Sequence, residues 1–196
     1  MSESTINATE DSAIVGVFVN GEALFPHAES SNLRTNPGYP TSEVLSAIFS
    51  FAERFGTDIR ERVIVRNWDD PSASTQSGVL MADLQRRLFQ LVHVPIKLGS
   101  GYGGDPKRPE ARQRALLGPL ERRATNWAHH VVEVSPESVV VVILVGLAEE
   151  PDLPDGVSLA TLDLHYGDLA SEDQVILDPQ GASLQINREL WAKWPA

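Results

Sequence analysis

An almost unbroken apolar run from Ser138 to Leu147 is the feature that most constrains the fold of this chain. A strand that is apolar on both faces belongs in the middle of a covered, mainly parallel sheet. The run is about half as long as a bilayer crossing requires, so we expect a strand and no membrane contact. Met1 to Ser12 contains no Lys or Arg and no apolar core, which excludes a secretory signal and predicts a cytoplasmic protein.

Strand and helix patterns alternate along the rest of the chain. Short β-branched runs predict strands, and apolar residues at three- and four-residue steps predict helices. The predicted strands are Ile14–Val19, Arg62–Asn67 and Val94–Leu98, followed by Ser138–Leu147. The predicted helices are Thr41–Phe55, Gly78–Val92 and Glu110–His130, the last interrupted at Gly118-Pro119. Val157–Tyr166 and Gln174–Leu177 are further extended candidates. This order predicts a three-layer α-β-α fold with a mainly parallel sheet.

Length and charge organise the chain further. Its 196 residues predict one α/β domain over residues 13–196, preceded by a flexible polar tail over residues 1–12. The net charge is −11, and Glu133 to Ala196 carries 12 acids but only two bases. This acidic C-terminal third places any phosphate-binding surface in the first two thirds of the chain. The absence of Cys excludes disulfides, thiolate metal sites and thiol nucleophiles.

Acidic residues follow three of the predicted strands. Glu22 comes after the first strand, Asp69 and Asp70 after the second, and Glu149 and Glu150 after the fourth. Ligands of parallel sheets bind where the carboxyl ends of the strands meet. Carboxylates gathered there would bind Mg²⁺ or Mn²⁺, which can activate water for attack on a phosphodiester. The alternative is that these acids are ordinary solvated loop residues.

The segments Ile14–Phe25 and Arg62–Asp70 resemble the first two strands of NYN domains, a branch of the PIN-like nuclease superfamily. The order of elements from Ile14 to Glu150 also fits that family. The resemblance implies a metal-dependent ribonuclease in which Glu22, Asp69, Asp70 and Glu149 are catalytic and Glu22, Asp70, Glu149 and Glu150 bind the metal. This chain departs from the family motif, because Asn20 stands where the family has its first catalytic Asp and Ala23 where it has an Asn. A catalytically degraded copy is therefore an open alternative.

A basic stretch runs from Lys97 to Arg123, with seven Lys and Arg against three acids. Cations with an interleaved aromatic side chain suit the backbone and bases of single-stranded RNA. The predicted RNA-binding residues are Lys97, Tyr102, Lys107, Arg108, Arg112 and Arg114. The alternative is an ordinary exposed helix face, or a patch that pairs with the acidic C-terminal third.

Two other functions fit the sequence. One is a non-catalytic module that binds a protein partner or forms a homo-oligomer, with Trp191 and Trp194 as interface anchors. The other is a nucleotide-binding enzyme, because Gly99–Gly104 matches the G-x-G-x-x-G pattern. His129 and His130 follow Trp127-Ala128 near a predicted helix end, where a structural role is expected.

Overall fold

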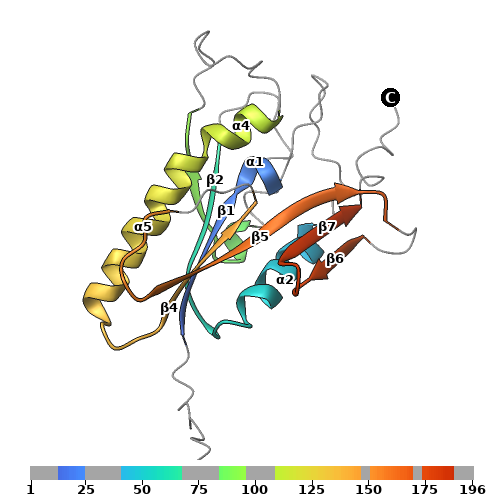
Figure 1. The fold of residues 1–196 in the computed structure, drawn as a ribbon. Helices are drawn as coiled ribbons and strands as arrows, with labels where there is room; N and C mark the ends of the chain where they lie inside the picture. The colour runs from blue at the N-terminus through green and yellow to red at the C-terminus, as the bar shows by residue number, and fades with distance from the viewer. Residues whose placement is uncertain are drawn as a thin grey trace, which may run out of the picture.

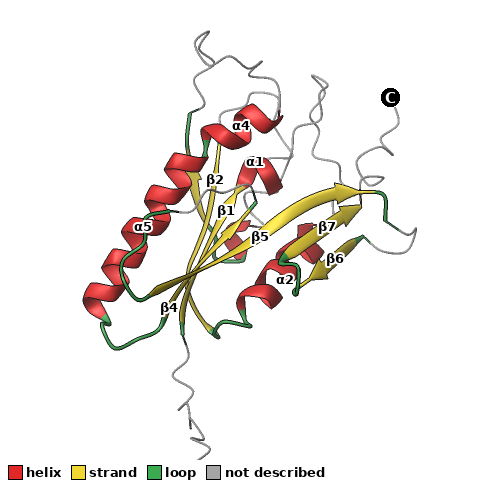
Figure 2. Cartoon of the chain, viewed as in Figure 1, coloured by secondary structure: helices red, strands yellow, loops and turns green. Residues whose placement is uncertain are grey.

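The fold is taken from a computed structural model of the full chain. It describes residues 13–24, 41–67, 84–95, 109–146, 151–169 and 174–187. Seven strands form one sheet in the order β3-β2-β1-β4-β5-β7-β6 (Figures 1 and 2). Neighbouring strands are parallel from β3 to β7, and only the edge strand β6 is antiparallel to its neighbour. The predicted α/β class with a mainly parallel sheet is confirmed.

The centre of the sheet consists of the two strands that the sequence marks most strongly. β1 (Ile14–Asn20) and β4 (Val140–Val145) are buried at every position. They pair with each other, and each has a second parallel neighbour, β2 (Asp58–Arg66) for β1 and β5 (Val157–Gly167) for β4. Helices on both faces require apolar side chains on both faces of the strand, which explains the continuous apolar runs.

Helix α2 (Thr41–Ala52) covers one face of the sheet. Its buried residues Val44, Leu45, Ile48 and Phe51 recur at helical steps and pack against apolar residues that extend from β1 to β7. The other face is covered by α5 (Leu117–Val134), which packs through Leu120, Ala124 and Ala128 among others. The two helices thus provide the outer layers of the three-layer fold.

In the part of the sheet formed by β5, β7 and β6, the described residues cover only one face. β7 (Ser183–Asn187) and β6 (Val175–Asp178) bury alternate residues toward α2. On the opposite face, exposed side chains include Thr161, Asp163, His165 and Gln185, and no helix in the described part of the chain lies over them. None of the described helices combines the length and apolar character needed to cross a membrane.

Two predicted elements near the middle of the chain have the wrong bounds. The helix predicted over Gly78–Val92 does not extend that far, because the chain turns at Leu88 and then forms β3 (Gln90–His93). The strand predicted over Val94–Leu98 therefore lies earlier in the chain. The N–H groups of Leu88 and Phe89 donate to the carbonyls of Gln85 and Leu84, which ends the preceding turn in a Schellman motif.

The predicted helix Glu110–His130 is two helices in the structure. α4 (Pro109–Ala115) ends one turn before the predicted break at Gly118-Pro119, and α5 continues from Leu117 to Val134. After β1 the chain forms a single helical turn, α1 (Gly21–Leu24). β7 has no counterpart among the predicted strands, and residues 1–12 lie outside the described residues.

Candidate functional site

The short helix α1 places Glu22 directly after the central strand β1. Glu22 therefore lies where the carboxyl ends of the parallel strands meet, which we call the carboxyl edge of the sheet. Its side chain is 1 % exposed. The close approach of α1 to β2 depends on Gly21, because a Cβ at this position would lie 2.8 Å from Cβ of Arg66 and 2.9 Å from the carbonyl oxygen of Val65. Gly21 and Glu22 therefore have distinct roles, one in packing and one in the polar site.

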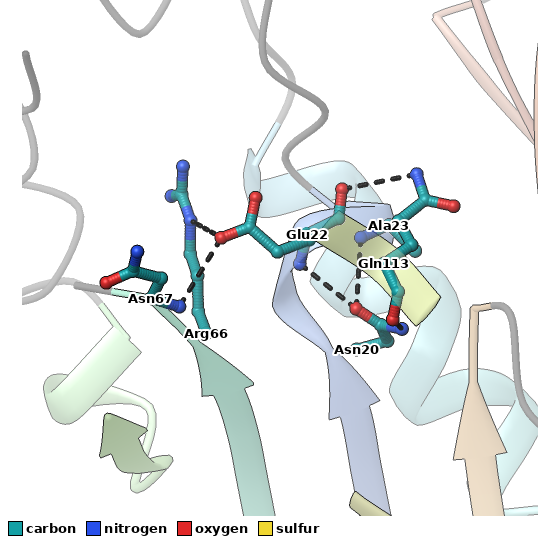
Figure 3. Close-up of polar contacts among 6 residues, drawn as sticks. All are labelled: Asn20, Glu22, Ala23, Arg66, Asn67 and Gln113. Atoms are coloured by element: carbon teal, nitrogen blue, oxygen red, sulfur yellow. Dashed lines mark hydrogen bonds and ion pairs between the residues drawn. The ribbon is translucent and has the colours of Figure 1, made fainter. Parts of the chain in front are cut away.

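Glu22 forms an ion pair with the last residue of β2. The distance from Nε of Arg66 to Oε1 of Glu22 is 3.5 Å, and the Arg66 side chain is 6 % exposed. The backbone N–H of Asn67 also donates to Oε1 of Glu22, at 3.4 Å (Figure 3). Burial of both charges in one pair makes each dependent on the other, since an uncompensated charge in the interior is costly.

Asn20 has a structural role on the other side of α1. Its Oδ1 accepts the backbone N–H groups of Glu22 at 3.2 Å and Ala23 at 3.3 Å, which caps the helix. Its Nδ2 donates to the carbonyl oxygen of Gln113 at 3.2 Å. Figure 3 shows the side chains of Asn20 and Glu22 pointing in different directions, Asn20 toward α4 and Glu22 toward the end of β2.

Helix α4 and strand β5 complete the contacts of α1. Nε2 of Gln113 donates to the carbonyl oxygen of Glu22 at 3.4 Å, so α4 is bonded to α1 through this side chain and to Asn20, at the end of β1, through its backbone. The hydroxyl of Tyr166, from β5, lies 2.8 Å from the carbonyl oxygen of Ala23 and 3.0 Å from that of Leu24, and it shares its one hydrogen between these two acceptors. The carboxyl edge therefore joins elements from three distant parts of the sequence.

Of the acidic residues predicted to form the site, only Glu22 is among the described residues. Asp69, Asp70, Glu149 and Glu150 lie outside the described residues, so their distances from Glu22 stay untested. The described residue at the end of β2 is a cation, Arg66, which the sequence analysis did not single out. A signal for it existed in the sequence, because Arg66 closes the β2 pattern at the same edge as Glu22.

Only two of the six predicted RNA-binding residues are among the described residues. Lys97, Tyr102, Lys107 and Arg108 lie outside the described residues, as do Trp191, Trp194 and the glycine-rich segment Gly99–Gly104. Arg112 belongs to α4, and Arg114 is an exposed residue of the same helix. Arg114 directly follows Gln113, whose side chain bonds to the carbonyl oxygen of Glu22 in α1.

The described residues of this edge do not fit a divalent cation. Asn20 could offer one carbonyl oxygen, but two N–H groups already occupy its lone pairs. Glu22 adds one carboxylate, which faces a guanidinium. Within the described ranges, no group of three or more His, Cys, Asp or Glu side chains could hold a metal ion.

Comparison of the chain with protein-family models, with curated proteins and with solved structures finds no match.

Proposed function

We propose that this chain is a PIN-like α/β domain of the NYN type whose carboxyl edge binds single-stranded RNA and has lost nuclease activity. The alternation of strands and helices along the chain from β1 to β4 supports the first part, because the resemblance is based on that order of elements. The proposal that the site is degraded depends on one observation above the others. The Asn20 amide, at the position of the family's first catalytic Asp, is engaged at both ends in holding α1 and α4.

The proposed RNA path is supported by the position of α4. The Gln113 contacts fix this helix against α1, and Arg114, the next residue along, is exposed on the same helix. An RNA backbone that follows the carboxyl edge would meet positive charge on α4. Cations that contact phosphates contribute affinity without base specificity, so we expect binding with little sequence preference.

Binding and cleavage are tested together with a short fluorescein-labelled single-stranded RNA. We expect an anisotropy increase on titration with the protein, and no Mn²⁺-dependent product on a denaturing gel. Arg114→Ala should weaken binding and lower the slope of log K against log salt by about 1, since one phosphate contact is lost. Arg60→Ala is the matched control, because Arg60 is an exposed cation near the opposite end of β2.

The outcomes separate the alternatives. Mn²⁺-dependent cleavage by the wild-type protein that disappears in a folded Glu22→Gln variant would overturn the degraded site and favour an active ribonuclease. Absence of an anisotropy change in low salt would overturn RNA binding. Equal weakening by Arg114→Ala and Arg60→Ala would place the RNA elsewhere on the molecule.

A further inference from the structure

Strand β6 forms one edge of the sheet. It pairs with β7 on one side, and no described residue pairs with its other side. Natural edge strands are commonly protected by short length, charged side chains, Pro or a bulge. β6 has four residues and is followed directly by Pro179, and within it Val175, Ile176 and Leu177 form an apolar segment without Lys, Pro or a bulge. The opposite edge strand differs, because the Arg123 side chain bonds to Gln90 of β3.

The hydrogen-bond phase of β6 shows which backbone groups face outward. The N–H of Asn187 donates to the carbonyl of Gln174 at 3.0 Å, which makes these residues a hydrogen-bonded pair of the antiparallel ladder. Since such pairs alternate, Ile176 also directs its N–H and C=O toward β7. The N–H and C=O groups of Val175 and Leu177 therefore point away from the sheet.

We propose that β6 pairs with β6 of a second copy of this chain, antiparallel and about a twofold axis through Ile176. In this register Val175 of each copy lies opposite Leu177 of the other. The four groups that face outward on each strand then form about four hydrogen bonds across the interface. The two sheets become one continuous sheet, and an isologous contact of this kind closes as a dimer.

The side chains of β6 favour a second copy as the occupant of this edge. Ile176 is 38 % exposed on the open face of the sheet, and the twofold axis brings it against Ile176 of the second copy. Asp178 would lie opposite the uncharged Gln174 and not opposite another Asp178. Oδ1 of Asp178 accepts the N–H groups of Gln180 and Gly181, both at 3.0 Å. In the proposed dimer, Oδ2 of Asp178 would therefore accept a hydrogen bond from the Gln174 amide of the second copy.

A single introduced cysteine tests this contact cleanly, because the chain contains no Cys. Position 176 is a non-hydrogen-bonded pair across the axis, with a Cα separation of about 4.5 Å, which suits a disulfide. Ile176→Cys should therefore give a cross-linked dimer under mild oxidation. Gln185→Cys is the matched control, since Gln185 is exposed on the same face directly opposite Ile176 on β7. The two copies of position 185 would lie about 14 Å apart, too far for a disulfide.

The register has its own test. Gln174→Cys and Asp178→Cys chains should cross-link when mixed, and much less when each is oxidised alone. Sedimentation of the wild-type protein should show dimerisation that Ile176→Lys abolishes. A wild-type monomer at every accessible concentration, equal cross-linking at positions 176 and 185, or failure of the mixed 174 and 178 chains to cross-link would each overturn the proposed pairing.

Discussion

Removal of the Arg66 cation provides the sharpest test of the buried polar site. Arg66→Met keeps the length and much of the volume of the side chain but leaves the Glu22 carboxylate 1 % exposed without this counter-charge. Breaking a buried ion pair on one side typically costs about 3–5 kcal/mol. At roughly 2–4 °C per kcal/mol for a chain of this size, the thermal midpoint should fall by about 6–20 °C. Urea unfolding followed by circular dichroism gives the free energy directly.

A double-mutant cycle separates the charge pairing from simple loss of packing. Glu22→Gln should also be destabilising, and the Glu22→Gln/Arg66→Met protein should be more stable than the sum of the single losses by about 2 kcal/mol or more. Arg60→Met is the matched control. Its pair with Asp58 is shorter, at 2.7 Å, but the side chains are 50 % and 39 % exposed, so we expect no resolvable shift of the midpoint. Additive losses in the cycle would refute the coupling of Glu22 to Arg66.

Three further substitutions test backbone and site geometry by urea unfolding. Leu88 has a φ of 64° and is 72 % exposed, so Leu88→Gly should stabilise by about 0.5–1 kcal/mol while Leu88→Ala does not; a less stable Gly variant would refute this strain. Gly146→Ala should lower the free energy of unfolding more than Gly156→Ala. Both glycines have positive φ, but only Gly146 has a side-chain carbon within 2.7 Å of the added Cβ. Equal losses of stability in the two variants would contradict the packing argument. Asn20→Asp loses the donor to the Gln113 carbonyl and should cost about 1–3 kcal/mol; an unchanged midpoint would contradict the structural role of this amide.

The parallel core of the sheet could be predicted from the sequence because its strands are apolar at consecutive positions. Ile14–Val19 and Ser138–Leu147 contain the buried strands β1 and β4 with only small differences at the ends. The pairing of two such strands on covered faces follows from their need to bury both sides. The fold class could therefore be predicted from these two strands, whose apolar patterns are the strongest in the chain.

The region around β3 could not be predicted from local patterns. A left-handed residue that ends a helical turn is usually Gly or Asn, and this chain uses Leu88. Nothing in the sequence therefore signalled the turn, and the helical apolar spacing continued across it. β7 was missed for another reason, since Leu184 and Ile186 alternate with polar residues over only five positions.

The candidate site was predicted at one residue and missed at its partner. The rule that ligands of parallel sheets bind at the carboxyl ends of the strands singled out Glu22, and the structure places Glu22 directly after β1. Its contact with Arg66 depends on the register in which Asn20 lies beside Val65, and a single sequence does not reveal that register. The structural role of Asn20 was equally hidden, because its partner Gln113 is far away in the sequence.

The position of β1 has a consequence for synthesis of the protein. This strand emerges first among the described strands, yet one of its two neighbours is β4, from the last third of the chain. Until β4 has emerged from the ribosome, the side of β1 that pairs with β4 lacks its native neighbour. The apolar residues of β1 are then open to non-native contacts. Pairing across such a long stretch of sequence is also slow. A nascent chain stalled before Val140 should therefore bind chaperones that a chain extended past Asn187 no longer needs.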